Sequence, residues 1–415
     1  MSRESPLNSL HQQAEAEFLW YGPTPATPGS PGSPGTPGAP VGEKPQPVGA
    51  AVVETFGEIE GEYAAIRKGC VVLDLPQRGA VRITGAERVD FLNRMVTQEL
   101  KGLKPFETRD AFWLNRRGRI DADLRIVQLP DEMYFDLDAL VSAHTVETLT
   151  SFIFSEEIEL KDQSESMHRL ALHGPSAPAL LAEISEPIDG PTVGDLAAAS
   201  AGATIVRIAG KRIIVDRRSD VGEIGFGLLM EAGAVADVYE QILERGLDGA
   251  HESGAGRFKM RPAGWAAYNI ARIEAGTPLF NVDFGSNSLP AETGLLDHRV
   301  SFTKGCYLGQ EVVARMKSLG HPKQTLVGLR IAPEHESNPA AQPVTGAPLT
   351  QPDDPGAKPI GAITSSTRSP MLGDAIICFA QVKWDLAKPG TELLVETDAG
   401  KIAAKVADSL VFWKR

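Results

Sequence analysis

Cysteine is scarce in this chain. The 415 residues include three cysteines, Cys70, Cys306 and Cys378, and no two of them form a CxxC pair. A disulfide framework needs several paired cysteines, and a structural zinc or iron–sulfur site needs ligands at close spacing. The sequence therefore encodes neither a disulfide scaffold nor a self-sufficient metal site, and we predict no metal ligands.

Long apolar runs and positive charge are also in short supply. No stretch approaches the roughly 20 apolar residues that a membrane helix needs. The first ten residues, MSRESPLNSL, lack the basic region and apolar core of a secretory signal. The formal net charge of −13 argues against a general polyanion binder, because affinity for a phosphate backbone depends on clustered Lys and Arg. We therefore expect a cytoplasmic protein with no membrane partner and no direct nucleic-acid binding.

Three common catalytic signatures are missing too. The chain has no G-x-x-x-x-G-K-[ST] loop, no G-x-G-x-x-G turn between a strand and a helix, and no HExxH pair. These absences exclude proteins that bind nucleotides through such loops, and zinc proteases with an HExxH motif. The composition, 42% hydrophobic and 23% charged residues, is that of a soluble globular protein, and the length fits two or three domains.

The N-terminal part differs in composition from the rest. Residues Gly22 to Pro40 consist only of Gly, Pro, Ser, Thr and Ala, and such a segment has no apolar surface to offset its ordering entropy. We predict that residues 1–50 form a disordered Pro/Gly-rich extension, in which EAEFLWYG before the linker forms a short docking helix. The folded body then begins near Ala51.

Residues 51–324 mix strand and helix patterns. CVVLDL and AVRITG indicate buried strands, and the stretch around Arg116 indicates two strands joined by a turn at residues 115–118. PAGWAAYNIARIEAG indicates a helix, with Pro262 in its first turn and Gly276 after its end. From residue 325 to 415, short strand-like runs separated by Gly and Pro predict a small all-β domain.

Glu223 is a first candidate for ligand binding. It lies in VGEIGFG between two glycines, which allow a flat ligand to approach the backbone closely. An ionised carboxylate can accept two parallel hydrogen bonds from an amino-pyrimidine edge. The alternative is a strand-entry turn with a solvated glutamate, which the residues alone favour.

Arg272 and Glu274 form a second candidate pair near the end of the predicted helix. They are two residues apart, so they do not face each other on a helix and must contact different neighbours. Contact with a ligand and structural salt bridging both remain open.

Cys306 is the third candidate. It lies in KGCYLGQEVVARM, residues 304–316, where Lys304 would favour the thiolate, which is a nucleophile or a soft metal ligand. On the alternative interpretation, Lys304 is a solvated turn residue and Cys306 a small buried hydrophobe. Gln310 and Glu311 would then begin a helix.

A cluster of arginines, Arg116, Arg117, Arg119 and Arg125, surrounds Asp121 and Asp123. The cluster is either a contact for RNA or an anionic tail, or a solvated hairpin. We favour the hairpin.

Taken together, Arg272 to Met316 resembles the signature of the YgfZ family of folate-binding proteins, which are relatives of the glycine cleavage T-protein, an aminomethyltransferase. The most specific part is K-G-C-Y-x-G-Q-E at Lys304 to Glu311, and the resemblance covers most of Val71 to Arg415 but not the first 50 residues. It implies an α+β fold of the T-protein type. Two α+β subdomains in residues 51–324 and a C-terminal antiparallel β-barrel in residues 325–415 would surround a central folate channel.

The resemblance also implies catalytic residues. Asp123 falls where the T-protein has the catalytic aspartate of its Asp-Asp-Leu run, although here the run is interrupted as Asp121-Ala122-Asp123-Leu124. The Asp-x-Ser-His segment of the T-protein is replaced by DLPQR, residues 74–78. Cys306 would provide thiol chemistry near the folate, and Lys304 would lower the pKa of the thiol or meet an anionic group.

Cofactor-binding residues follow in the same way. Glu223 would hold the pterin edge, and Tyr307 would stack on a planar ligand. Gln310 and Glu311 would order the turn. Arg272 and Glu274, near the end of the predicted helix, would also contact the cofactor. The residues implied to bind the cofactor are therefore Glu223, Arg272, Glu274, Tyr307, Gln310 and Glu311.

The function implied first is binding of tetrahydrofolate, or a one-carbon derivative, in support of iron–sulfur cluster assembly or repair, including clusters of tRNA-modifying enzymes. The partners would be iron–sulfur proteins or cluster-assembly factors. One thiolate cannot hold a cluster that normally takes four ligands, so any cluster contact would be transient or shared. The alternatives are a folate-dependent aminomethyltransferase and a scaffold that binds protein partners only.

Overall fold

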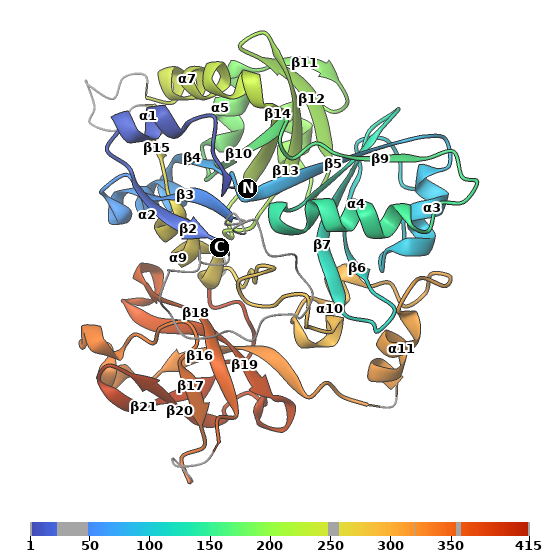
Figure 1. Ribbon diagram of the computed structural model, residues 1–415. Coiled ribbons are helices and arrows are strands. Elements are labelled where there is room, and N and C mark those ends of the chain that lie inside the picture. The colour runs from blue at the N-terminus through green and yellow to red at the C-terminus, as the bar shows by residue number, and fades with distance from the viewer. Residues whose placement is uncertain (1, 23–48, 248–256, 319, 354–357, 414–415) are drawn as a thin grey trace, which may run out of the picture.

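The computed structural model describes residues 2–22, 49–247, 257–318, 320–353 and 358–413 (Figure 1). Within these ranges the chain forms two sheets with helices packed on them, a small N-terminal sheet, and a closed six-stranded barrel. Figure 1 shows the barrel, in orange and red, below the two larger sheets. The predicted α+β fold with a C-terminal barrel is confirmed.

The large sheet combines strands from the middle of the chain with one early strand, β4. Its strands, in spatial order, are β11 (Glu186–Asp189), β12 (Ala203–Ile208), β13 (Lys211–Arg218), β14 (Gly225–Glu231), β10 (Met167–His173), β4 (Cys70–Asp74) and β15 (Met260–Pro262). Strand β4 is buried along its whole length. Its alternate residues enter two cores, Val72 on one face and Val71 on the other, as the pleat requires.

Helices cover both faces of the large sheet. The helices whose side chains join the core that contains Val72 are α5 (Ala177–Ile184), α6 (Val193–Ala198) and α7 (Val235–Gly246). The helices that join the core on the Val71 face are α2 (Ile59–Lys68) and α9 (Trp265–Glu274). Burial on both faces explains why residues 70–73 of β4 are a continuous apolar run and not an alternating one.

The second sheet carries the predicted hairpin. Its strands, in spatial order, are β6 (Thr108–Leu114), β7 (Ile120–Gln128), β8 (Met133–Asp138), β5 (Arg78–Thr84) and β9 (Glu159–Asp162). Helices α3 (Arg88–Met95) and α4 (Ser142–Thr150) pack on it, and Leu92 and Leu149 enter its core. The turn between β6 and β7 contains Gly118 at φ +70°, a conformation that glycine adopts without strain.

The barrel begins at Gln324. Its strands, in spatial order, are β16 (Gln324–Ile331), β19 (Ala375–Lys383), β18 (Gly361–Ser369), β17 (Pro348–Thr350), β20 (Glu392–Thr397) and β21 (Gly400–Val406). Every neighbouring pair is antiparallel. The interior is apolar and includes Leu329, Cys378 and Leu393, each 0% exposed.

Short helices fill the connections. Between α9 and the barrel lie η3 (Pro290–Glu292), α10 (Leu296–Arg299) and α11 (Gln310–Ser318). The other 3₁₀ turns are η1 (Ala139–Val141), η2 (Ala232–Ala234), η4 (Pro333–His335), η5 (Pro339–Ala341), η6 (Pro370–Leu372) and η7 (Trp384–Leu386). In the described ranges, no helix has the length and apolar character needed to cross a bilayer.

The N-terminal segment differs from its prediction. Residues 2–22 form β1 (Ser2–Arg3), α1 (Asn8–Gln13) and β2 (Glu17–Tyr21), and both strands pair with β3 (Gly49–Thr55). The prediction of a disordered 1–50 extension is therefore wrong for these residues, and EAEFLWYG contains a strand, not a helix. Of the predicted linker, Gly22 to Pro40, residues 23–40 lie outside the described ranges.

Buried contacts explain why this segment is ordered. Leu7 is 0% exposed in the core of the large sheet. Ser5 donates to Asp74, and His11 Nε2 and His168 Nε2 lie 2.9 and 2.6 Å from the two oxygens of the same carboxylate. Burial alone would raise the pKa of Asp74, but His168 and His11 hold it below its usual range. These partners are far apart in sequence, so local composition did not reveal them.

Leu7→Ala tests whether the N-terminal segment is part of the folded core. Removing this buried side chain should lower the free energy of unfolding by about 2–5 kcal/mol, because it leaves a cavity in the core. Urea unfolding measures the change, with the exposed Gln13→Ala as a control expected within about 0.5 kcal/mol of wild type. A Leu7→Ala protein as stable as wild type would contradict this packing.

Candidate functional site

A central pocket lies where the two large sheets meet the loop after α9. Its cavity measures about 120 Å³, and it receives side chains from β2, β6, β7, β13, α9 and α10. The residues that line it are Tyr21, Leu75, Gln77, Arg78, Asp110, Asp123, Arg125, His173, Arg218, Asp220, Trp265, Tyr268, Thr277, Pro278, Leu279, Phe280 and Arg299.

Two carboxylates in this pocket share one guanidinium. Arg299 at the end of α10 places Nε 2.8 Å from Asp123 Oδ1 and Nη1 3.1 Å from Asp110 Oδ2. Asp110 on β6 stands opposite Arg125 on β7, which also contacts it at 3.1 Å. Asp123 is two residues before Arg125, and therefore on the same face of the sheet.

The two carboxylates differ in how many of their oxygens are bonded to arginines. Burial alone would raise the pKa of Asp110, but Arg299 and Arg125 keep it below its usual range. Asp123 is contacted by Arg299 through Oδ1, and among the described residues no group donates to its Oδ2. Asp123 Oδ2 is therefore the carboxylate oxygen available to a bound molecule.

Aromatic side chains line another part of the pocket. Trp265 and Tyr268 lie three residues apart on one face of α9, with ring centroids 5.8 Å apart. Tyr21 of β2 lies 6.3 Å from Trp265, and His173 lies 6.2 Å from Tyr268. This wall suits a flat ring, and the nearby carboxylates suit its N–H groups.

His173 is a buried polar group whose Nδ1 has no partner in the described chain. It is 1% exposed, and its Nδ1 makes no hydrogen bond there. Burial lowers its pKa to about 4, so the ring is neutral at pH 7. The residue lines the central pocket, and its Nδ1 lies against Gly225 of the neighbouring strand β14.

A buried ion network supports the pocket from behind. Asp216 of β13 accepts from Arg169 at 2.7 Å within the large sheet and from Arg125 of β7 at 2.7 Å across the interface. Arg218 also lies 3.0 Å from Asp216 and reaches Asp136 of β8. Burial would raise the pKa of Asp216, but Arg218, Arg169 and Arg125 hold it below its usual range. The two sheets are therefore joined by ion pairs.

Of the three residues predicted to be catalytic, Asp123 lines the central pocket, and Lys304 and Cys306 are not in its described lining. Lys304 instead caps helix α3, because its Nζ donates to the carbonyls of Asn93, Val96 and Gln98 at 2.6, 2.7 and 2.9 Å. Burial lowers the pKa of Lys304 to about 8. Cys306 is exposed. The hydrogen bonds of Lys304 are thus directed to α3, not to the thiol.

The residues after Cys306 form a turn and a helix. Tyr307 is 8% exposed and packs in an apolar cluster with Phe112 and Val313, so its ring is enclosed by protein. The Gln310 N–H donates to the Tyr307 carbonyl at 3.2 Å, and α11 begins there. Glu311 is exposed in the first turn of α11. Gln310 and Glu311 therefore begin a helix, as the alternative interpretation of the sequence expected.

Glu223 and Glu274 belong to one buried network around Arg67, away from the pocket wall. Arg67 Nη1 lies 3.9 Å from Glu223 Oε1, and Arg67 Nη2 pairs with Glu274. Tyr63 donates to Glu274 at 2.7 Å, and the Arg67 guanidinium lies 4.4 Å from the Trp413 ring centroid. In the described chain, neither glutamate is among the residues that line the central pocket.

Arg272 ties α9 to the barrel. It is 0% exposed and its guanidinium contacts Asp283 at 2.6 Å, Ser365 at 2.6 Å and the Thr277 carbonyl at 3.1 Å. Glu274 is also 0% exposed and accepts from Ser369 of the barrel. The charged groups of Arg272 and Glu274 are both bonded to other groups of the protein. This geometry favours structural salt bridging over contact with a ligand for these two residues.

Several pocket residues were not identified from the sequence. They are Asp110, His173, Asp220, Trp265, Tyr268 and Arg299. The spacing of Trp265 and Tyr268 on the predicted helix was a usable signal, because both fall on one face. Arg299 gave none, since its partner Asp123 is 176 residues away. Three residues of the DLPQR segment, Leu75, Gln77 and Arg78, also line the pocket.

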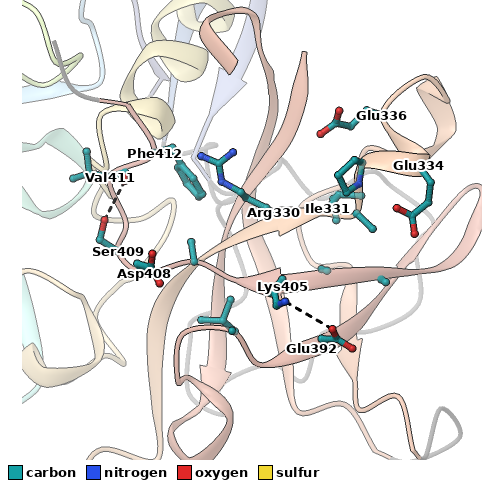
Figure 2. A pocket seen from close by; sticks show the side chains of 17 residues that line it. Arg330, Ile331, Glu334, Glu336, Glu392, Lys405, Asp408, Ser409, Val411 and Phe412 are labelled. Carbon is teal, nitrogen blue, oxygen red and sulfur yellow. Dashed lines mark hydrogen bonds and ion pairs between the residues drawn. The ribbon is translucent and has the colours of Figure 1, made fainter. Parts of the chain in front are cut away.

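A larger cavity of about 860 Å³ lies on the outside of the barrel. Figure 2 shows Glu334, Glu336, Glu392 and Asp408 around it, with Arg330 and Lys405. In the described chain, none of the residues predicted for catalysis or cofactor binding lines this cavity. The central pocket, which contains Asp123, is therefore the candidate site.

Two family descriptions match the chain. The GCVT N-terminal domain matches residues 37–304, and the glycine cleavage T-protein C-terminal barrel domain matches residues 324–414. An aminomethyltransferase of Synechococcus sp. is 27% identical over 350 residues, which cover 82% of this chain and 87% of that protein. One from Bacillus velezensis is 26% identical over 366 residues, covering 87% and 91%.

A solved structure shows the same fold. The glycine cleavage system aminomethyltransferase T from Bartonella henselae matches with a TM-score of 0.77 and 22% sequence identity. The match covers 99% of this chain and 98% of that one, so the likeness extends to the N-terminal segment as well as the barrel.

Lys304→Met separates the capping role of Lys304 from a role in thiol activation. The variant should lose about 1–3 kcal/mol of stability, because three carbonyls lose a buried donor. The pKa of Cys306 should stay the same, as measured by the pH dependence of its reaction with a disulfide reagent. Burial raises the pKa of Cys70 and Cys378, so Cys306 dominates the reaction.

The exposed Lys317→Met is the matched control for the loss of a lysine charge on the same segment. A rise of the Cys306 pKa by roughly one unit in Lys304→Met alone, worth about 1.4 kcal/mol, would show that Lys304 does activate the thiol.

Proposed function

The chain belongs to the glycine cleavage T-protein family, and we propose that its central pocket binds a reduced folate and acts on the one-carbon unit that the folate carries. Residues 51–324, with β2 of the N-terminal segment, would form the folate-binding region, and residues 325–415 the barrel that supports it. The cytoplasmic location predicted from the sequence is part of this proposal.

The chemistry of the pocket fits the ring of a reduced folate. A pterin presents a flat face and an amino-pyrimidine edge that donates hydrogen bonds. Trp265 and Tyr268 offer the aromatic surface, and Asp220 offers a carboxylate on the same pocket. Asp220 lies three residues before Glu223, so we propose that Asp220 meets the pterin edge in place of Glu223. The neutral His173 would add a further polar contact.

The observation that carries the proposal is the position of Asp123. Its Oδ1 is fixed by Arg299 at 2.8 Å, while Oδ2 is available on the pocket wall. Such a carboxylate can hold or accept a proton as a one-carbon unit is transferred, and general acid–base groups of this kind contribute roughly 10²–10⁴-fold to rate. Asp110, held as an anion by two arginines, would supply a constant negative charge beside it.

The names of the relatives support this activity over the other candidates. The proteins from Synechococcus sp. and Bacillus velezensis are both named aminomethyltransferase and match over most of their length. We therefore propose aminomethyl transfer to tetrahydrofolate as the reaction to test first. The carbon of the aminomethyl donor forms bonds to two folate nitrogens, which gives methylene-tetrahydrofolate. Its bonds to the amino group and to the carrier break, and the two protons of the folate nitrogens leave with ammonia and the released carrier.

Asp123→Asn tests this proposal. The amide cannot take up the proton, so methylene-tetrahydrofolate formation from an aminomethyl donor should fall by roughly 10²–10⁴-fold. The dissociation constant for tetrahydrofolate, measured by calorimetry, should change by less than about threefold, or about 0.65 kcal/mol. Asp121→Asn on the same strand is the control, because Asp121 is bonded to Asn115 and does not line the pocket.

Wild-type turnover in Asp123→Asn would remove Asp123 from the reaction. Loss of tetrahydrofolate binding in this variant would make Asp123 a binding residue, contrary to the proposal.

A second candidate function is the YgfZ-like one, support of iron–sulfur cluster assembly or repair. The observation that favours it is the exposure of Cys306 within the K-G-C-Y-x-G-Q-E run, while Cys70 and Cys378 are buried. An exposed thiol can react with a partner, whereas a buried one is inert. Because clusters normally take four ligands, Cys306 would act on a cluster together with an iron–sulfur protein.

Cys306→Ser distinguishes the two candidates. If the second function holds, this variant should fail to restore methylthiolated tRNA nucleosides in cells that lack the protein, as measured by mass spectrometry. The exposed Thr303→Ala in the same turn should restore them fully. Full restoration by Cys306→Ser, together with unchanged methylene-tetrahydrofolate formation, would leave the one-carbon function alone.

A further inference from the structure

A second cavity adjoins the central pocket on the side of the N-terminal segment. This rear cavity measures about 510 Å³, and its lining includes Arg3, Gln77 and Asp162. The N-terminal segment, helix α4 and strands β9 and β10 all contribute to its wall. Because Ala143 and Glu165 on the lining are exposed, the cavity is open to solvent.

Two side chains line both the rear cavity and the central pocket, those of Tyr21 and Gln77. The Tyr21 hydroxyl donates to Asp138, so the phenol is fixed at its tip. Gln77 is only 6% exposed, and in the described chain its carbonyl oxygen Oε1 has no hydrogen-bond partner. A buried amide oxygen is destabilising until a donor reaches it. The partition between the two spaces therefore presents an acceptor to a small N–H donor.

The rear cavity is negatively charged. Glu4, Asp162 and Glu165 line it, and none of the three forms an ion pair with another described residue. A single arginine opposes them, Arg3, whose guanidinium donates to two backbone carbonyls. The only histidine of the described lining, His168, is bonded to a carboxylate outside it. The lining thus attracts cations.

The Asp162 carboxylate is held in place by neutral donors. Ser142 Oγ donates to its Oδ2 at 2.8 Å, and the hydroxyl and the N–H of Ser164 donate to its Oδ1 at 2.6 and 2.9 Å. These bonds fix the orientation of the carboxylate and leave its negative charge in the cavity. Asp162 is therefore prepared for a positively charged ligand.

The central pocket has the opposite sign. In the described lining, three aspartates face four arginines, and the ring of His173 is neutral. The arginines are Arg78, Arg125, Arg218 and Arg299. A small cation formed in the central pocket is consequently repelled there and attracted to the rear cavity, across the partition of Tyr21 and Gln77.

One product of the proposed reaction fits this path. The amino group of the aminomethyl donor leaves as ammonia, which takes up one further proton from water at pH 7 and becomes ammonium. Ammonia has a single heavy atom, so it passes a partition that stops a folate. Both forms donate N–H hydrogen bonds, which the Gln77 oxygen accepts.

We propose that the rear cavity is the binding site and exit route for the ammonia that is released in the central pocket, with Gln77 as the acceptor on its path. The inference rests on the proposed function and adds the destination of one product. Ammonia then leaves while methylene-tetrahydrofolate is still bound, and the two products depart independently.

Ala143→Trp, which would fill the rear cavity from its open side, tests the route. Methylene-tetrahydrofolate formation by the full chain is measured with added ammonium chloride, and with sodium chloride at the same concentration as reference. The inhibition constant for ammonium should rise at least about tenfold, because ammonium from solvent no longer reaches the central pocket, and kcat should fall. KM for tetrahydrofolate should stay within about twofold. Ala314→Trp, exposed on α11 and outside both linings, should change none of these.

The double variant Glu4→Gln/Glu165→Gln tests the charge. At low salt its inhibition constant for ammonium should rise at least about threefold, and the difference from wild type should shrink as salt screens the carboxylates. Glu240→Gln/Glu396→Gln removes two exposed carboxylates outside both linings and should behave as wild type.

An unchanged inhibition constant in Ala143→Trp would overturn the assignment, because ammonia would then leave by another route. A parallel rise in KM for tetrahydrofolate would overturn it as well, as a general disturbance of the site. Wild-type inhibition in the double variant would contradict capture of a cation. If Ala143→Trp does not fold, Ala232→Trp on the same cavity replaces it. A wild type that forms no methylene-tetrahydrofolate would contradict the proposed function itself, a result distinct from all of these.

Discussion

The buried ion network between the two large sheets is the constraint on which the site depends. Asp136 of β8 is 0% exposed and pairs with Arg78 at 2.9 Å in its own sheet, and with Arg169 at 3.4 Å and Arg218 in the other. An ion taken out of water is tolerated only with its partners in place, and removal of one partner typically costs about 3–5 kcal/mol. These ion pairs therefore fix the position of one sheet relative to the other. The pocket-facing arginines, Arg125 among them, are fixed with it.

The pocket takes its charge from elements that are distant in the chain. Asp110 and Asp123 come from the β6–β7 hairpin, and Arg299, which bridges them, comes from the end of α10. The segment that carries Arg299 into the pocket continues within a few residues to Lys304, which caps α3, and to the exposed Cys306. A single stretch of chain thus connects the pocket of the one-carbon proposal with the thiol of the iron–sulfur proposal. A change at α10 would affect both.

Much of the architecture was predictable because it follows from local pattern. Residues 70–73 of β4 are an unbroken apolar run, and α9, residues 265–274, lies inside the stretch bounded by Pro262 and Gly276. The short runs after residue 325 do form a barrel. The order of the N-terminal segment was not predictable, since it depends on Asp74, 63 residues from His11. For the same reason, the sequence identified Glu223, Arg272 and Glu274 as charged residues but did not show which protein groups bond to them.

The most direct test of the account is a calorimetric titration of tetrahydrofolate into the wild-type protein at pH 7. The aromatic wall of Trp265 and Tyr268 and the Asp220 carboxylate on the same pocket predict saturable binding of one molecule per chain. Absence of binding, under conditions in which the protein is folded, would contradict the claim that the central pocket is a folate site, and would leave the fold as a scaffold for protein partners.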